Sequence, residues 1–268
     1  MEQALFDSLI DISQTPAARQ GKADLMLERA RWAATVFERY DRDRTMAIVQ
    51  AVADAAHDMA GELAEKAVAE TGFGVVAHKK IKNQLTARPL VEFYRDHDYV
   101  NFRIDEERKI VEIPRPAGVI FALTPSTNPI ATLNYKILLA MMTRNAIVIS
   151  PHPAARLSSV ASARALARAA KNAGAPDGII QILEHPSIPM VEAFISSPKT
   201  NVILATGGTP MVRAAYSSGN PAIGVGPGNA PVFVDDSADI TKAAQRIVAS
   251  KSFDNSVLCT NESVLITL

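Results

Sequence analysis

Residues 117–129 read Ala-Gly-Val-Ile-Phe-Ala-Leu-Thr-Pro-Ser-Thr-Asn-Pro, an apolar run that passes directly into a short polar loop. The continuous apolar run over residues 117–123 is typical of a strand that is buried on both faces, as in a parallel sheet. A helix is predicted after the loop, over residues 130–143, so the segment begins as a strand-loop-helix unit. Because ligands bind at the carboxyl ends of parallel strands, this loop is a candidate binding loop.

Alternating strands and helices continue to residue 251. Strands are also predicted over residues 109–114, 146–150, 179–183, 201–205 and 231–234, and helices over residues 155–173, 189–196, 211–217 and 240–251. Such repeated units imply a parallel sheet with helices on both faces. Before them, apolar residues recur at helical spacings over residues 22–40, 44–70 and 77–98, and Pro89 interrupts the last helix. The predicted fold class is α/β, with N-terminal helices followed by a Rossmann-like parallel sheet.

Composition excludes several classes of partner. Lys plus Arg and Asp plus Glu number 28 each, so no net field favours nucleic acid or an anionic membrane. No apolar stretch approaches the roughly 20 residues that cross a bilayer, and the N-terminus lacks the pattern of a signal peptide. A single cysteine cannot form an internal disulfide, which fits a reducing compartment. We therefore expect a cytoplasmic protein that acts on small molecules, with no nucleic acid, membrane or metal as partner.

Short polar loops follow three of the predicted strands. They are Thr124-Pro125-Ser126-Thr127-Asn128-Pro129, Pro151-His152-Pro153 and Thr206-Gly207-Gly208-Thr209-Pro210. A further segment, Gly224-Val225-Gly226-Pro227-Gly228-Asn229, has the wrong spacing for a dinucleotide fingerprint, and its proline removes a backbone donor. We interpret that segment as a tight loop beside a strand.

Cys259 is the single cysteine, and it lies in the segment Ser252-Phe253-Asp254-Asn255-Ser256-Val257-Leu258-Cys259-Thr260. Taken alone, a lone thiol is commonly a small buried apolar residue. A thiol that is partly ionised at neutral pH can instead act as a nucleophile. The residue types alone leave both interpretations open.

Five segments in the same order resemble the aldehyde dehydrogenase family, and more closely its CoA-acylating branch. They are Asn128 in its loop, residues 174–178 (Gly-Ala-Pro-Asp-Gly), residues 206–208, residues 224–229 and Cys259. In addition, Phe253-Asp254-Asn255 followed four residues later by Cys259 resembles the nucleophile segment of the acylating enzymes. The similarity covers essentially the whole chain, and it implies an NAD(P)-dependent oxidoreductase.

The resemblance implies a role for each matching residue. Cys259 would carry the acyl group as a thioester, and Asn128, with the backbone N–H of Cys259, would stabilise the oxyanion. The short aldehyde and CoA would be the substrates, and NAD or NADP would be the cofactor. The residues implicated in binding the cofactor are Thr124, Pro125, Ser126, Thr127, His152, Pro153, Gly178, Thr206, Gly207, Gly208 and Gly226.

Two departures from the family pattern bear on the subclass. Hydrolytic members carry a glutamate that activates water where this chain has Val225, and a valine cannot accept a proton. The thioester would therefore be transferred to CoA. His152 stands where many relatives have a lysine that contacts the adenosine ribose or a 2′-phosphate, so NAD and NADP both remain open.

The resemblance also divides the chain. Residues 1–108 would form the helical part of the cofactor-binding domain, residues 109–238 its Rossmann-like core, and residues 239–268 the start of an incomplete catalytic domain with its first strand over residues 263–268. Because family members continue beyond the nucleophile, we expect a C-terminally truncated chain and a full-length enzyme that is a homo-oligomer. The apolar stripe of Leu5, Leu9 and Ile12 is expected to pack against its own subunit.

The sequence leaves alternatives open for both the substrate and the function. Acetaldehyde and other short aldehydes are the usual substrates of this branch, whereas residues 256–262 resemble the group that acylates sulfoacetaldehyde. The chain could instead be a catalytically incomplete nucleotide-binding or assembly fragment, which binds a cofactor or a partner chain without turnover. Another reductase of the family, such as the glutamyl-phosphate type, is the second alternative. Formation of a thioester on Cys259 separates the enzyme from the fragment.

Overall fold

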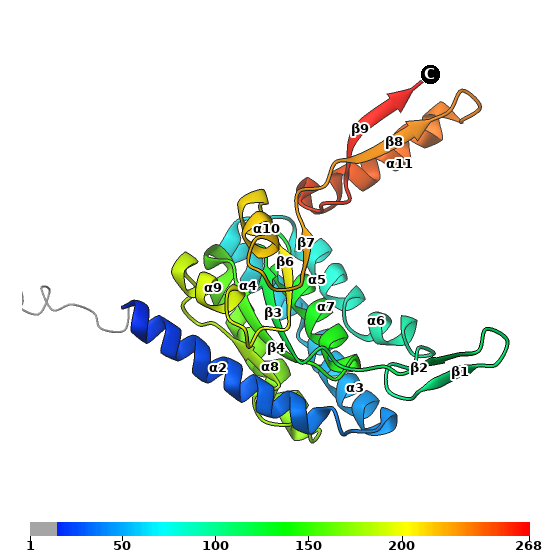
Figure 1. Ribbon diagram of the computed structural model, residues 1–268. Helices are drawn as coiled ribbons and strands as arrows, with labels where there is room; N and C mark the ends of the chain where they lie inside the picture. The colour runs from blue at the N-terminus through cyan, green and yellow to red at the C-terminus, as the bar shows by residue number, and fades with distance from the viewer. Residues whose placement is uncertain (1–14) are drawn as a thin grey trace, which may run out of the picture.

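The computed structural model describes residues 15–268, so the stripe of Leu5, Leu9 and Ile12 lies outside the described residues. Helices come first in the chain (Figure 1): α2 (Pro16–Phe37), α3 (Arg42–Asp58), α4 (Ala60–Thr71), α5 (Val76–Leu85) and α6 (Arg88–Phe93). The helix predicted over residues 44–70 is divided at Met59, and Gly72 ends its second half with a φ of 70°. Pro89 lies in the first turn of α6 instead of kinking a longer helix, and this position suits it because the first turn of a helix does not need the missing N–H.

A five-stranded parallel sheet forms the centre of the molecule. Its strands are β3 (Val119–Thr124), β4 (Ala146–Pro151), β5 (Ile180–Ile182), β6 (Val202–Thr206) and β7 (Ala222–Val225), in the spatial order β5-β4-β3-β6-β7. The helices between them are α7 (Pro129–Met142), α8 (Arg156–Asn172), α9 (Ile188–Ile195) and α10 (Thr209–Tyr216), with a short 3-10 turn, η2 (Pro153–Ala155), before α8. The strand order reverses between β3 and β6, and ligands of such sheets bind at the carboxyl ends beside that reversal.

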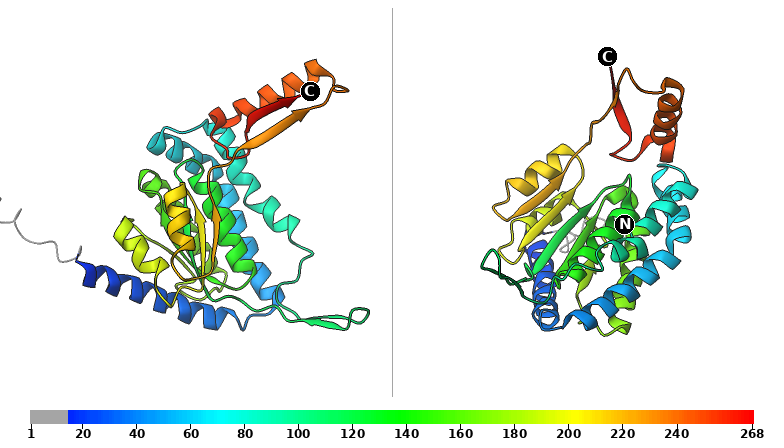
Figure 2. Two further views of the ribbon diagram at one scale, coloured as in Figure 1. Left: turned by 45° about the horizontal axis from the view of Figure 1, so that its top comes forward. Right: turned by 90° about the vertical axis from the view of Figure 1, so that its right-hand side faces the viewer.

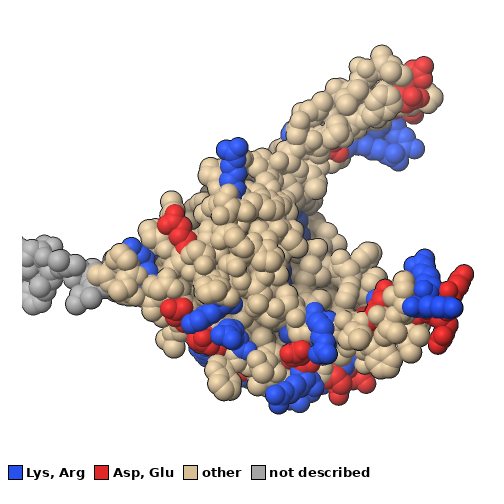
Figure 3. All heavy atoms as spheres, in the orientation of Figure 1, with Lys and Arg blue, Asp and Glu red and all other residues tan. Residues whose placement is uncertain are grey.

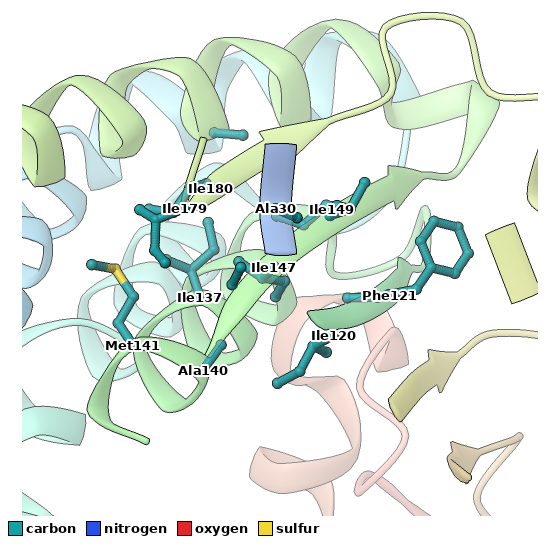
Figure 4. Packing of buried hydrophobic residues seen from close by; sticks show 14 of the residues in the cluster. Ala30, Ile120, Phe121, Ile137, Ala140, Met141, Ile147, Ile149, Ile179 and Ile180 are labelled. Atoms are coloured by element: carbon teal, nitrogen blue, oxygen red, sulfur yellow. The ribbon is translucent and has the colours of Figure 1, made fainter. Parts of the chain in front are cut away.

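Helices cover both faces of this sheet, as the sequence predicts. α7 and α8, backed by α3, lie on one face, and α2, α9 and α10 lie on the other (Figure 2). Every residue of β3 and β4 is buried, which explains their continuous apolar sequence. Phe121 of β3 stacks on Phe194 of α9 with ring centroids 4.8 Å apart, and Figure 4 shows Ile137 and Met141 of α7 in the same core as Ile147. Burial of each such side chain stabilises the fold by about 1.5–3 kcal/mol.

The strand predicted over residues 109–114 lies outside this sheet. β1 (Arg103–Asp105) and β2 (Ile110–Glu112) pair antiparallel as a separate hairpin that projects from the body (Figure 1). The alternating sequence produces a strand, but Ile110 and Val111 are both exposed and join no core within the described chain. The structure thus confirms the strand and corrects the expectation that it belongs to the parallel sheet.

The chain leaves the sheet after β7 and forms a C-terminal arm (Figure 1). The arm holds β8 (Ala230–Val234), α11 (Ile240–Ser252), the short 3-10 turn η3 (Phe253–Ser256) and β9 (Glu262–Thr267). β8 pairs parallel with β9 rather than with β7, so the strand predicted over residues 231–234 belongs to a second sheet. The strand predicted over residues 263–268 is confirmed as β9.

Strand β7 corrects the interpretation of the glycine-rich segment as a loop. Gly224 and Val225 pair with Ala205 and Thr206 of β6, and the loop begins only after Val225. A side chain at Gly224 would collide with α10, because an added Cβ would lie 2.6 Å from Cγ1 of Val212. β7 is an edge strand whose residues alternate between half-buried and exposed, so it lacks the apolar run that identifies β3.

Charged side chains of both signs are distributed over the surface. On the face shown in Figure 3, Lys and Arg lie among Asp and Glu on the body, the hairpin and the arm. This face therefore presents no broad field of one sign. Within residues 15–268, no helix combines the length and the apolar character that a membrane span requires.

Candidate active site

A cavity of about 580 Å³ opens at the carboxyl ends of β6 and β7. Its wall is formed by α5, α7, these two strands and the segment before β9, and both Asn128 and Cys259 line it. The other lining residues are Lys82, Leu85, Thr86, Ala131, Thr132, Tyr135, Lys136, Leu139, Leu204, Thr206, Ile223, Val225 and Leu258. The fold therefore brings the two residues predicted to be catalytic to one cavity.

Cys259 lies in the turn between η3 and β9, and it is exposed. The loop after β7 approaches this turn closely, because an added Cβ at Gly228 would lie 2.4 Å from the carbonyl oxygen of Cys259. Asn261 holds the turn from the other side. Its side chain accepts from the Leu258 N–H at 2.9 Å and donates to the Ser250 carbonyl at 2.5 Å. The backbone next to the thiol is thus held by contacts on both sides.

Three successive residues before the thiol adopt left-handed backbone conformations. Asp254, Asn255 and Ser256 have φ values of 52°, 54° and 60°. This conformation is disfavoured for residues other than glycine and costs about 1–3 kcal/mol per strained residue. Tertiary contacts must therefore maintain it, and the side chain of Asp254 supplies several of them.

Asp254 is fully buried and receives hydrogen bonds from α5 and from Val75, the residue just before this helix. The Val75 N–H donates to Oδ1 at 2.8 Å, Lys79 Nζ lies 3.3 Å from Oδ2, and Lys82 Nζ also donates to Oδ2. The backbone N–H of Asp254 donates in turn to Nδ1 of His78 at 2.9 Å. These contacts join α5 to the loop that carries Cys259.

The pKa values of this cluster reflect burial and mutual attraction. Burial would raise the pKa of Asp254, but hydrogen bonds from Lys82 and the Val75 N–H, together with the charges of both lysines, outweigh it and lower that pKa. Burial lowers the pKa of Lys82 against the opposing effect of its hydrogen bond to Asp254, and the charge of Lys79 lowers it further. Because two lysines share one carboxylate, the ionised cluster carries a net positive charge beside the cavity, which favours an anion there.

The amide of Asn128 is held at both ends. Its Oδ1 accepts from Lys82, and its Nδ2 donates to the Val257 carbonyl at 3.3 Å. Asn128 also directly precedes α7, whose first turn begins with a proline. Since Val257 lies two residues before Cys259, these contacts fix the amide relative to the nucleophile loop.

Lys136 lies at the wall of the same cavity, where the strand order of the sheet reverses. Its Nζ donates to the carbonyl oxygens of Leu123 in β3 and Leu204 in β6, at 2.7 Å each. Only 6% of Lys136 is exposed. This burial lowers the pKa of Lys136 from 10.5 to about 7, so it exchanges its proton in the neutral range.

A second cavity, of about 310 Å³, adjoins the first at Thr206, which lines both. The loops after β3, β4 and β6 form its wall, and the predicted cofactor residues found there are Thr124, Pro125, His152, Pro153, Thr206, Gly207 and Gly208. Ile188, Val191 and Met211 add an apolar side that suits an adenine ring. Gly208 directly precedes α10, so the positive end of that helix lies at the wall and suits a phosphate.

Four predicted cofactor residues line neither of these two cavities. Ser126 and Thr127 belong to the loop after β3, and the Thr127 carbonyl accepts a hydrogen bond from Lys79 at 2.7 Å. Gly226 follows β7. Gly178 precedes β5 and so lies at the opposite edge of the sheet, where it has a φ of 86° and an added Cβ would lie 2.6 Å from the Arg29 side chain.

Sequence reasoning does not identify the lysines of this site. Lys79 and Lys82 lie one turn apart on a helix that also carries Lys80, and this pattern is typical of a solvated helix face. Asp254 enters the sequence argument only as part of the nucleophile segment. Lys136 could have been found, because it is the one charged residue in the apolar sequence of α7 and lysine is rarely buried.

Comparison with known proteins gives consistent matches. The sequence model of the aldehyde dehydrogenase family matches residues 10–267. A bifunctional aldehyde-alcohol dehydrogenase of Escherichia coli (strain K12) is 39% identical over 244 residues, which cover 91% of this chain and 27% of the relative. A crystal structure of an acetylating aldehyde dehydrogenase from Geobacillus thermoglucosidasius is 42% identical with a TM-score of 0.91, covering 97% of this chain and 57% of that one.

A third match is a propionaldehyde dehydrogenase from Rhodopseudomonas palustris, solved with bound CoA and an acylated cysteine. It is 34% identical with a TM-score of 0.83, and the match covers 92% of this chain and 56% of that one. The chain therefore spans little more than half of the length of the two solved relatives, and about a quarter of the bifunctional enzyme.

Proposed function

We propose that this chain, which belongs to the aldehyde dehydrogenase family, carries the NAD(P)-binding site and the nucleophile of a CoA-acylating aldehyde dehydrogenase. The observation that carries this proposal is the pair of adjoining cavities. Cys259 and Asn128 line the first cavity. The family resemblance assigns the loops of the second cavity to the cofactor, and the two cavities meet at Thr206. The similarity to an acetylating enzyme of known structure supports the acylating branch.

In the first half of the reaction, the Cys259 thiolate adds to the carbonyl carbon of the aldehyde. The carbonyl oxygen becomes an oxyanion, and the Nδ2 hydrogen of Asn128 and the backbone N–H of Cys259 stabilise it. These donors lower the barrier because the charge exists only in the transition state and the intermediate. Bound NAD(P)+ supplies the hydride acceptor. Loss of hydride from the former aldehyde carbon leaves a thioester on Cys259.

In the second half, the acyl group is transferred from Cys259 to the CoA thiol. The thiol loses its proton to water, the CoA sulfur bonds to the acyl carbon, and Cys259 leaves as a thiolate. Val225 lines the cavity at the position where the family resemblance places the water-activating glutamate of hydrolytic members, and it cannot act as a base. The propionaldehyde dehydrogenase that binds CoA and carries an acylated cysteine supports this order of events.

The second cavity suits the adenosine and phosphate part of a dinucleotide of the NAD or NADP type. Its apolar side would hold the adenine ring, and the start of α10 after Gly208 would hold a phosphate. Nδ1 of His152 accepts from the Ala154 N–H at 3.1 Å, so the neutral ring carries its hydrogen on Nε2 and can donate it to a ribose hydroxyl. This chain's residues thus bind and orient the cofactor beside the first cavity.

The first cavity favours a short aldehyde of the acetaldehyde type. Leu85, Leu139 and Ile223 contribute apolar wall, which suits a small alkyl group. A sulfoacetaldehyde would need donors for its sulfonate. Lys82 and Lys136 are the lysines on the wall, and two of the three donors of each ammonium group already go to protein oxygens, so each has at most one donor left for a sulfonate. We therefore place acetaldehyde before sulfoacetaldehyde.

The organisation of the chain follows from the same proposal. Residues up to Val225 would form the cofactor-binding domain, and the arm over residues 230–268 would belong to the catalytic domain, so the boundary lies earlier than the expected residue 238 because β8 pairs with β9. The whole enzyme would be a homo-oligomer. The hairpin of β1 and β2, with its exposed Ile104, Ile110 and Val111, is a surface that another subunit could cover.

The test is thioester formation on the thiol. The chain and its Cys259→Ala variant are incubated with acetaldehyde and NAD+ or NADP+, and intact mass reports an acyl adduct. We expect an adduct on the parent alone, and its discharge with further NAD(P)H formation when CoA is added. Folded protein that forms neither adduct nor NAD(P)H contradicts the proposal. Cofactor binding without an adduct would favour the binding-fragment alternative, and turnover of an acyl phosphate alone would favour the glutamyl-phosphate type.

A further inference from the structure

A closed ring of hydrogen bonds joins Asp254, Lys82, Asn128 and Val257 beside the cavity. Lys82 Nζ donates to both Asp254 Oδ2 and Asn128 Oδ1, and Asn128 Nδ2 donates to the Val257 carbonyl. Asp254 and Val257 lie in the same loop, so the ring returns to the segment that carries the nucleophile. Lys82 and Asp254 are both buried, which strengthens these hydrogen bonds by keeping water away.

The ring determines which way the Asn128 amide points. An ammonium group has three donors and no acceptor, so the amide atom that faces Lys82 must be the oxygen. The amide nitrogen then faces the nucleophile loop. One of its hydrogens goes to Val257, and the second is available to a group in the cavity. Without Lys82, the amide can turn over and present its oxygen, an acceptor, to the position where an oxyanion forms.

We propose that Lys82 is a positioning residue that orients the Asn128 amide, so that an N–H rather than the carbonyl oxygen faces the oxyanion formed on Cys259. The inference rests on the proposed function and adds a residue to it. Lys79 shares the Asp254 carboxylate, but its other contact is the Thr127 carbonyl and not the Asn128 amide. Lys80 is exposed on the same helix and provides a matched control.

Two reactions of Cys259 separate orientation of the amide from charge on the thiol. In acylation by p-nitrophenyl acetate, the thiolate bonds to the acetyl carbon, an oxyanion forms, and p-nitrophenolate leaves with its bonding pair. In alkylation by iodoacetamide, the thiolate displaces iodide from a saturated carbon and no oxyanion forms. Both rates are measured, with intact mass to confirm the site, on the chain and on Lys82→Met, Lys82→Arg, Lys80→Met, Asn128→Ala and the double variant Lys82→Met/Asn128→Ala.

Lys82→Met should slow acylation more than alkylation, because both reactions lose the Lys82 charge near Cys259 but only acylation also loses the oriented donor; Asn128→Ala should slow acylation alone. Asn128→Ala should slow acylation by about 10²–10³-fold, and Lys82→Met by between about tenfold and a hundredfold through misplacement of the donor. Lys82→Arg keeps the charge and the donors, so it should recover most of the rate. Lys80→Met should match the parent in both reactions. In the double variant, Lys82→Met should add to the loss of Asn128→Ala no more than it costs in alkylation, because one residue acts through the other.

Several results would overturn the inference. Equal losses in acylation and alkylation would assign the effect of Lys82 to the thiolate, and full additivity with Asn128→Ala would separate the two residues. If circular dichroism shows that Lys82→Met is unfolded, Lys82→Arg and Lys82→Gln, which both keep a donor, decide the matter. Loss of acylation in both folded variants overturns the inference. A parent that is alkylated but never acylated overturns the proposed function itself, whereas unchanged acylation of Lys82→Met overturns this inference alone.

Discussion

Replacing Lys136 by methionine should remove a pH-dependent contribution to the free energy of unfolding, namely the cost of keeping a charged lysine buried in the folded state. Burial lowers the pKa of this lysine from 10.5 to about 7, so the folded protein releases the proton more readily than the unfolded chain does. Methionine is an unbranched side chain without charge, so it fills the site without titrating. The substitution also removes the hydrogen bonds to the carbonyl oxygens of Leu123 and Leu204, an effect that does not depend on pH.

The magnitude follows from the two pKa values of Lys136. Between pH 7 and pH 10.5 the unfolded chain holds more protons at this site, so the free energy of unfolding rises with pH, by up to about 1.4 kcal/mol per pH unit. The free energy of unfolding of the parent rises by about 2 kcal/mol between pH 7 and pH 9, and by only about 0.4 kcal/mol between pH 5 and pH 7. This stability is fully present above pH 10.5 and is lost as the pH falls through 7, because the lowered pKa penalises the charged form.

Guanidinium chloride unfolding at several pH values measures the effect as the difference between the parent and Lys136→Met. The lost hydrogen bonds shift the variant by about 1–3 kcal/mol at every pH, so the test is the change with pH and not the absolute stability. Lys80→Met, which replaces an exposed lysine, should keep the pH dependence of the parent. Parallel curves for the parent and Lys136→Met between pH 7 and pH 9 would refute the reasoning.

Two further predictions concern the loop and the cavity of Cys259. Asp254→Asn leaves two buried lysines without their carboxylate and should lower the free energy of unfolding by about 3–5 kcal/mol. Chemical unfolding measures this against the exposed control Asp96→Asn, and a loss no greater than the roughly 1 kcal/mol of a surface ion pair would contradict a buried cluster. Val225→Glu places a carboxylate on the cavity wall and should speed hydrolysis of an acetyl thioester on Cys259 by about a hundredfold. Intact mass against time follows deacylation, and a rate equal to that of the uncharged Val225→Gln would count against a general base at this position.

The central layers of the fold can be predicted from local sequence. β3 and β4 are apolar throughout because both faces of each strand are buried, and the intervening helices carry the spacing of buried faces. These patterns report how much of each segment is buried. They do not report which strand lies beside which, and β2 and β8 therefore form strands as expected but pair outside the parallel sheet.

Edge elements are less predictable for the same reason. β7 alternates between half-buried and exposed residues, and its Gly224 is required by contact with α10 rather than by a turn. The division of the helix at Met59 likewise has no proline or glycine at that position to announce it. Both features depend on how distant segments pack against each other, and the local sequence pattern does not predict that packing.

The candidate site shows the same division between sequence and structure. The sequence by itself determined the strand-loop order, and its resemblance to the aldehyde dehydrogenase family identified Cys259 and Asn128 as candidate nucleophile and oxyanion donor, because the segments that carry the resemblance are short and continuous in the chain. Only the tertiary structure decided that Lys82 and Asp254, far apart in the chain, meet beside them and hold the amide and the loop together. The physical reason is that a buried ion pair forms only where two elements meet in space. The periodicity of apolar residues along one element predicts which face is buried, but not which other element packs against it.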